Sequence, residues 1–212
     1  MHRLLQLVFF VLFVRPLLAL ILGVNLRHAE RLPQSGPVIL AANHNSHLDT
    51  LLLMSLTPLA QLHRVRPVAA ADYFLRNRVV AWFARHIMHI LPLSRRPKPG
   101  EKPLAHIEAA LAEGDILILF PEGSRGEPEK RSALKSGIAH LMETAPTVPV
   151  VPIYLRGLGK ALPKGDWLPI PFFADGWVGE PLTWQGSRAA TMQALETRFV
   201  ELEREGHAPA WE

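Results

Sequence analysis

Short apolar runs alternate with helix-like segments along most of this chain, and that alternation limits the possible folds more than any other feature. The clearest run is DILILF at residues 115–120, and another is GPVILAAN at 36–43, which begins with a Gly-Pro turn. Apolar runs this short are typical of strands that are buried on both faces. Strands that alternate with helices predict an α/β domain with a largely parallel sheet flanked by helices.

The remaining segments extend this plan. We expect further strands at 66–71, 90–94 and 148–157, and helices at 73–88, 102–113, 132–144 and 187–205. Asp72 is a suitable N-cap for the helix that starts at Tyr73. Apolar residues recur at helical spacing in the last helix, at Met192, Leu195, Phe199 and Leu202. The prolines of VPVVPIYLRG place that strand near an edge or an end of the sheet, because proline cannot donate to a strand ladder.

The first 28 residues form a separate apolar segment, and residues 29–212 form the α/β domain in this interpretation. A membrane-spanning helix needs about 20 unbroken apolar residues. Arg15 and Pro16 interrupt the segment, and Pro16 disfavours a straight helix. We therefore predict two short apolar helices, bent at Arg15-Pro16, that anchor the chain by dipping into one leaflet of a membrane. A buried pair of core helices is the alternative.

The charge and the cysteine count narrow the function classes. The net charge is +4 and the pI is near 9.8, which suits anionic partners such as phosphates, acidic lipid surfaces or an acidic carrier. The chain contains no cysteine, which excludes disulfides, thiolate metal sites and a cysteine nucleophile. A basic block either forms a solvated surface or rests on anionic headgroups: Arg64, Arg66, Arg76, Arg78, Arg85, Arg95, Arg96, Lys98 and Lys102.

Polar clusters follow three of the expected strands. They are NHNSHLD, PLSRRPKPGEK and FPEGSRG, which start at residues 43, 92 and 120. Sites in parallel sheets gather at the carboxyl ends of the strands, so these clusters predict one functional site.

The first cluster contains a candidate catalytic base. His44 and Asp49 are five positions apart, so they share no face of a helix. They can meet if His44 lies in the turn and Asp49 lies in the first or second turn of the next helix. The carboxylate then accepts from one ring nitrogen and leaves the other as a base for a substrate hydroxyl.

A metal site is the rival interpretation of the same cluster. His44, His47 and Asp49 would be its ligands, in a metal-dependent hydrolase. No further cluster in the sequence has a recognisable ligand spacing to complete such a site. His47 also has a plainer interpretation, as a packed or capping residue in the first turn of the helix.

The other two clusters provide candidates for anion binding. Arg95 and Arg96 follow a strand directly, where an arginine can form two hydrogen bonds to one phosphate. In FPEGSRG, Gly123 permits an unusual turn, and Arg125 can bind an anion. Glu122 can accept from a glycerol hydroxyl or hold Arg125 in place.

Together these motifs resemble the glycerolipid acyltransferases of the 1-acylglycerol-3-phosphate acyltransferase (PlsC-like) type. Members of that family carry an NHx4D block, a strand that ends in arginine, an FPEG-[ST]-R block and a proline-containing apolar strand, in that order. Here these blocks are NHNSHLD, ILPLSR, FPEGSR and VPVVPIYLRG. The second block lacks an upstream glycine at the matching place, so the resemblance does not decide between Arg95 and Arg96.

The resemblance implies roles for individual residues. His44 matches the general base of the family, and Asp49 matches its partner. The residues that match the acceptor-binding blocks or neighbour them are Arg95, Glu122, Gly123, Ser124, Arg125 and Lys135. Pro152 lies in the fourth block, which the resemblance associates with the acyl donor or with shaping the site.

The implied reaction moves an acyl group from acyl-CoA or acyl-carrier protein to a lysophospholipid hydroxyl, without metal or cofactor. The implied acceptor is 1-acylglycerol 3-phosphate, the product is phosphatidic acid, and the enzyme works at a membrane, on the cytoplasmic face of the inner or plasma membrane. Another lyso-lipid acceptor and a non-catalytic membrane-surface protein remain alternatives.

Overall fold

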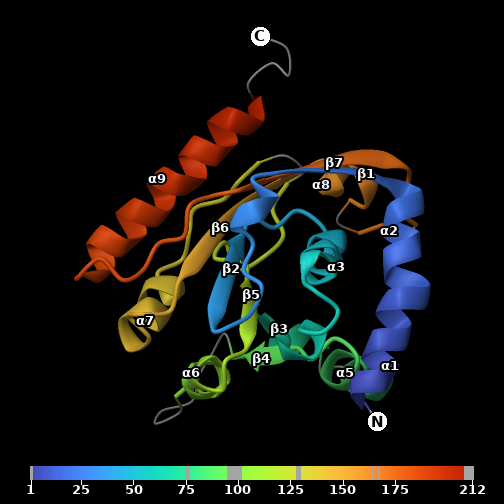
Figure 1. Ribbon diagram of the computed structural model, residues 1–212, viewed down its shortest axis with the longest axis horizontal. Coiled ribbons are helices and arrows are strands. Elements are labelled where there is room, and N and C mark those ends of the chain that lie inside the picture. The colour runs from blue at the N-terminus through green and yellow to red at the C-terminus, as the bar shows by residue number, and fades with distance from the viewer. Residues whose placement is uncertain are drawn as a thin grey trace.

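The computed structural model describes residues 2–74, 77–94, 102–127, 130–163, 165–166 and 168–207. Within these residues one seven-stranded sheet has the order β1-β7-β6-β2-β5-β3-β4 (Figure 1). Only the β6–β7 pair is antiparallel among the named strands, which confirms the largely parallel α/β fold. The strands are β1 (Leu22–Arg27), β2 (Val38–Ala42), β3 (Val65–Ala70), β4 (Leu91–Leu93), β5 (Ile116–Leu119), β6 (Val150–Arg156) and β7 (Phe172–Val178).

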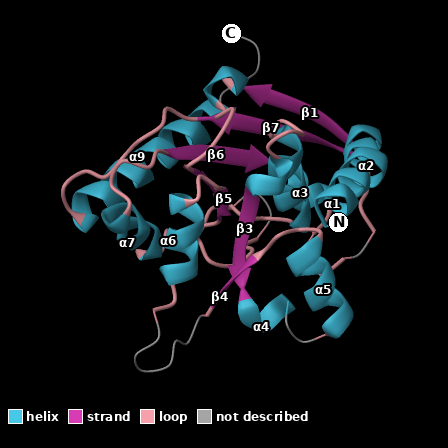
Figure 2. Cartoon of the chain, turned by 60° about the horizontal axis from the view of Figure 1, so that its bottom comes forward, coloured by secondary structure: helices cyan, strands magenta, loops and turns pink. Residues whose placement is uncertain are grey.

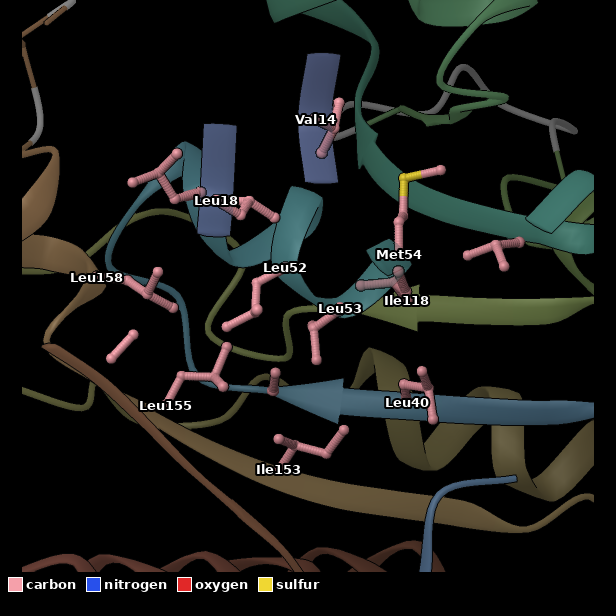
Figure 3. Close-up of a cluster of buried hydrophobic side chains, with 14 of the residues drawn as sticks. Val14, Leu18, Leu40, Leu52, Leu53, Met54, Ile118, Ile153, Leu155 and Leu158 are labelled. Carbon is pink, nitrogen blue, oxygen red and sulfur yellow. The ribbon is translucent and has the colours of Figure 1, made fainter. Parts of the chain in front are cut away.

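Helices cover both faces of the sheet, and the alternation of side chains along each strand explains why. In β2, Leu40 and Ala42 enter one apolar cluster, whereas Ile39 and Ala41 enter another on the opposite face. The first cluster, shown in Figure 3, joins the sheet to α3 (His47–Leu56) and to the N-terminal helix. The second joins it to α6 (Ala105–Ala112), α7 (Gly137–Thr144) and α9 (Arg188–His207). Because helices cover both faces of the central strands, the sequences of these strands are apolar throughout.

The N-terminal segment is one helical run, which forms a single column at the side of the molecule (Figure 1). It consists of α1 (His2–Phe9), a π-helical turn at Phe10–Val14, and α2 (Arg15–Ile21). The π turn absorbs the proline, because the Arg15 N–H bonds the Phe10 carbonyl and Pro16 then stands in the first turn of α2. The prediction of two separate helices, bent at Arg15-Pro16, is therefore replaced by a continuous run.

The helical part of the predicted 1–28 segment ends at Ile21, because the residues that follow join the sheet. Leu22–Arg27 form β1, which pairs in parallel with β7. Figure 2 shows β1, β7 and β6 side by side at one end of the sheet, with β3 and β4 at the other. Neither β1 nor β7 was expected from the sequence. The division into an anchoring segment and a domain stays a prediction.

The helix predicted over 73–88 is wrong as one element, because a second N-cap divides the region. The structure has α4 (Ala71–Phe74) and α5 (Arg78–His86). Asn77 has extended backbone, and its side chain accepts from the backbone N–H groups of Val79 and Val80. Such capping starts a new helix. Asp72, the expected N-cap, lies inside α4 instead.

Two further boundaries differ from expectation. The helix predicted over 132–144 begins only at Gly137, because the Ser132 and Lys135 N–H groups bond to Glu122 and to the Pro121 carbonyl instead. Strand β6 lies inside the sheet, between β7 and β2, so its predicted place near an edge is wrong. Pro152 is tolerated because regular β6–β7 pairing stops at Ile153, next to the missing N–H.

The last predicted helix is confirmed. Leu195, Phe199 and Leu202 are buried in α9, and Met192 packs against the cluster that contains Leu195 and Phe199. The remaining short helical elements are α8 (Leu158–Ala161) and two 3₁₀ turns at Ala29–Arg31 and Leu62–Arg64.

Candidate active site

The NHNSHLD motif begins directly after β2, where Asn43 ties that strand to its neighbour. The buried Asn43 side chain donates to the Leu155 carbonyl at 2.8 Å and accepts from the Leu155 N–H at 2.6 Å. This pairing continues the β2–β6 ladder through a side chain. His44 therefore starts from a fixed backbone position. Asn43 was not predicted to have a role, although its place directly before His44 was the available signal.

Asp49 is held by the start of α3 and in turn holds His44. Its Oδ2 atom accepts from the backbone N–H groups of Asn45 and Ser46, at 2.7 and 2.8 Å. Ser46 and Asp49 form a capping box, so the carboxylate is fixed by the helix N-terminus. The same oxygen lies 2.9 Å from His44 Nδ1. Asp49 is 1% exposed, so this contact is shielded from water.

The geometry leaves His44 Nε2 as the basic atom. An ionised carboxylate can only accept, so His44 Nδ1 carries the proton and donates it in the hydrogen bond to Asp49, and the lone pair is on Nε2. The ring also stacks on Phe120, with centroids 3.9 Å apart and planes 17° apart. The predicted contact between His44 and Asp49 is therefore present, with the ring orientation set from two sides.

Glu122 connects the second motif to the first. One carboxylate oxygen accepts from the His44 backbone N–H at 3.0 Å, and the other accepts from the Ser132 backbone N–H at 3.0 Å. Burial raises the pKa of Glu122, and the hydrogen bonds from Ser132 and His44 act in the opposite direction. The loops are joined once more, because the Gly126 N–H donates to the His44 carbonyl. This arrangement favours a role in holding the loops together, and a direct contact of Glu122 with substrate stays a prediction.

The turn after β5 collects the cationic groups. The Gly123 N–H bonds to the Phe120 carbonyl, and Gly123 has φ +78°, a conformation that favours glycine. A side chain at Gly123 would also meet Lys135, because an added Cβ would lie 2.6 Å from Lys135 Nζ. Gly123, Ser124 and Lys135 are exposed, and Arg125 is partly buried. Three of the predicted anion-binding residues thus share one turn, and Lys135 lies over it.

His47 lies close to this cationic group. Burial first, and then the positive charge of Arg125, lowers the pKa of His47 to about 4. The ring is therefore neutral at neutral pH. Its position links the first turn of α3 to Arg125, so the two motifs border one site.

Pro152 is a predicted site residue that falls outside this group. Pro152 is buried in the middle of β6 and packs near Gly179, beside Leu202 of α9. The structure does not bring it to the His44–Asp49 pair, so its role stays a prediction. Arg95, like Arg96, lies outside the described residues.

The described part of the chain contains no group of three His, Asp or Glu side chains arranged to hold a metal ion. His44 and Asp49 contact each other directly. The geometry therefore favours a base and its partner over a metal site.

Comparison with known proteins agrees with the motifs. The family model described as Acyltransferase matches residues 23–156, which include both motifs and the strands that carry them. The chain belongs to the acyltransferase family.

Individual relatives of this acyltransferase carry more specific names. The chain is 31% identical over 145 residues to the chloroplastic 1-acyl-sn-glycerol-3-phosphate acyltransferase LPAT1 of Arabidopsis thaliana, covering 68% of this chain and 38% of that protein. It is 27% identical over 192 residues to the 1-acyl-sn-glycerol-3-phosphate acyltransferase of Bacillus subtilis, covering 85% and 88%. The chain spans only about two fifths of the first of these relatives.

The fold of this acyltransferase also matches a solved structure. The crystal structure of PlsC from Thermotoga maritima, a 1-acyl-sn-glycerophosphate acyltransferase, aligns with a TM-score of 0.75. The alignment covers 96% of this chain and 81% of that one, at 21% sequence identity. The two chains share their overall architecture, including the helix-flanked sheet.

Proposed function

We propose that this acyltransferase moves an acyl group from a thioester donor to the free hydroxyl of 1-acylglycerol 3-phosphate, and thereby makes phosphatidic acid. The observation that carries the proposal is the His44–Asp49 pair, joined through Glu122 to the cationic turn at Arg125 and Lys135. A hydroxyl that lies beside a phosphate fits a base that lies beside cations. The names of the Arabidopsis and Bacillus relatives support the same acceptor.

In the proposed mechanism, His44 Nε2 removes the proton from the acceptor hydroxyl as the oxygen attacks the thioester carbonyl. Asp49 keeps Nδ1 protonated and stabilises the imidazolium that forms. The tetrahedral intermediate then collapses, the carbon–sulfur bond breaks, and His44 gives the proton to the departing thiolate. The bonds formed and broken balance without a metal, a cofactor or a covalent enzyme intermediate. Either acyl-CoA or acyl-carrier protein satisfies this chemistry as donor.

Arg125 and Lys135 are proposed to bind the phosphate of the acceptor, with the exposed Gly123–Ser124 backbone next to them. An arginine and a lysine supply charge-assisted hydrogen bonds that a neutral monoacylglycerol acceptor could not use. The proposal therefore predicts a preference for anionic lyso-lipids.

We propose further that the N-terminal helix holds the enzyme at a membrane surface, on its cytoplasmic face. Phe10, Val14 and Leu18 pack into the domain along the length of the helix, while other apolar side chains stay exposed. Arg15 donates to the Ser55 and Thr57 carbonyls at the end of α3, so its charge is satisfied by protein. A helix packed along its length, with one apolar side exposed, supports shallow insertion better than an isolated span.

The direct test uses the purified protein in detergent micelles, a panel of lyso-lipids, both thioester donors and mass detection of the products. His44→Ala should lower the rate of acyl transfer by roughly 10²–10⁴-fold, because the base is removed. His106→Ala is the matched control, since His106 is exposed on α6. Near-normal transfer by a folded His44→Ala protein would contradict the proposal. The panel also shows whether another headgroup is preferred.

Metal dependence separates this mechanism from a hydrolase that uses His44, His47 and Asp49. Excess chelator should leave acyl transfer unchanged. A loss of activity that one added divalent metal restores would favour the hydrolase.

A further inference from the structure

Arg131 links the segment after the cationic turn to α9. Its Nη2 atom lies 2.5 Å from Glu196 Oε1, and its Nε lies 3.5 Å from Glu203 Oε2. The guanidinium also lies over the Phe199 ring, 5.6 Å from the centroid. The Arg131 side chain is only 9% exposed, so α9 surrounds most of it.

The residue after Arg131 binds the active-site loops. The Ser132 N–H donates to Glu122 Oε2, while Glu122 Oε1 accepts from the His44 N–H. Three residues further on, the Lys135 N–H donates to the Pro121 carbonyl at 2.8 Å. The segment from Arg131 to Lys135 therefore lies along the turn that carries Gly123.

Helix α9, which holds Arg131, lies outside the residues that the family model matches. The family match ends at residue 156, and α9 begins at Arg188. An ion pair in which one partner is largely buried contributes little net stability, since desolvation of the charges offsets their attraction. Its better supported use is to select one arrangement of the groups around it.

We propose that Arg131 is a positioning residue for the acceptor site. By fixing the segment 131–135 to α9, it holds Lys135 over the turn that carries Gly123. The inference rests on the proposed acyl transfer to a phosphate-bearing acceptor. Loss of the Arg131 side chain should weaken binding of the acceptor and leave binding of the donor unaffected.

The experiment compares Arg131→Met with the wild-type protein in steady-state kinetics, with acceptor and donor each varied at saturating levels of the other. The KM for 1-acylglycerol 3-phosphate should rise about tenfold, because small displacements of binding groups have large effects. The kcat and the KM for the donor should stay within about twofold of wild type. Arg131→Lys, which keeps the charge but not the two-pronged geometry, should fall between them.

Two further variants keep the test decisive. The double variant Glu196→Gln with Glu203→Gln removes the two negative charges that pair with Arg131 on α9, where both side chains are partly exposed, and should reproduce the rise in acceptor KM. Arg188→Met is the matched control, because Arg188 binds Glu143 and joins α9 to α7 instead of to the turn. It should leave both KM values unchanged.

The outcomes separate this inference from the proposed function. A wild-type enzyme that acylates the acceptor, together with an unchanged acceptor KM in Arg131→Met and in the glutamine double variant, would overturn the positioning role alone. Equal rises in both KM values, or the same rise in Arg188→Met, would show a general structural role and would also overturn it. A wild-type protein without acyl transfer to any lyso-lipid would overturn both.

Discussion

The N-terminal helical run and α9 pack against the domain in similar ways, from opposite faces of the sheet. The first buries Phe10, Val14 and Leu18, and the second buries Leu195 and Phe199. Both stripes follow helical spacing. Each helix is also tied to the active-site region through an arginine, because Arg15 bonds to the end of α3 and Arg131 bonds to α9.

Their outer sides differ completely. On the N-terminal run, Leu12 and Phe13 are each 62% exposed and Leu20 is 83% exposed. On α9 the corresponding exposed residues are polar, namely Gln193, Thr197, Glu201 and Arg204. Phe9 also contacts Phe83 of α5, whose neighbours Val79 and Trp82 are exposed, so the apolar surface extends beyond one helix. Inward packing is therefore common to both helices, whereas the outer side is apolar on the N-terminal run, as the proposed membrane contact requires, and polar on α9.

The largest expected effect concerns these outer sides. The triple variant Leu12→Ser, Phe13→Ser and Leu20→Ser should weaken binding to phosphatidylcholine vesicles by roughly 4–6 kcal/mol, since three large apolar groups leave the membrane. Sedimentation with vesicles measures it. The matched variant on α9, with serine at Gln193, Glu201 and Arg204, should bind as wild type does. Equal binding by both variants would show that the outer sides of the two helices do not differ in their affinity for lipid.

The next prediction concerns the inward sides, where the two helices should behave alike. Phe10→Ala and Phe199→Ala should each lower the free energy of unfolding by about 3–5 kcal/mol, because each leaves a cavity at a fully buried site. Denaturant unfolding in detergent measures both. A negligible effect of Phe10→Ala would mean that the N-terminal run is not packed on the domain.

The smallest effect concerns the arginine of the N-terminal run. Arg15→Met should lower the free energy of unfolding by about 1–3 kcal/mol, since the Ser55 and Thr57 carbonyls lose a charged donor. Arg85→Met, at an exposed position of α5, is the control and should change stability little. Thermal unfolding of the two variants side by side distinguishes them. If both unfold as the wild type does, Arg15 does not link the helix to α3.

Much of the candidate site could be predicted from the sequence because its central contact is local. His44 and Asp49 are five residues apart, and the start of a helix is enough to bring them together. The strands at 36–43 and 115–120 were likewise visible as short apolar runs. The division of the helix at Asn77 was missed, although the cap lay within the sequence, because the apolar pattern continues across it.

Other features depended on contacts between distant segments. Leu22–Arg27 became a strand because β7, some 150 residues later, offers an edge for it to pair with. Glu122 is a link between loops because His44 and Ser132 present their N–H groups to it from either side. Pro152 can lie inside the sheet because the regular pairing between β6 and β7 ends at Ile153, so no partner in β7 needs the N–H that proline lacks.

By itself, then, the amino-acid sequence determined the family, the α/β alternation and the identity of the base and its partner, since these depend on residue type and short spacing. Only the tertiary structure decided which side of the N-terminal helix stays exposed, how Glu122 joins the two motifs, and that Arg131 is held by α9. Burial and ion pairing depend on groups that lie far apart in the sequence and come together only in the folded chain, so the spacing of residues along the sequence does not predict them.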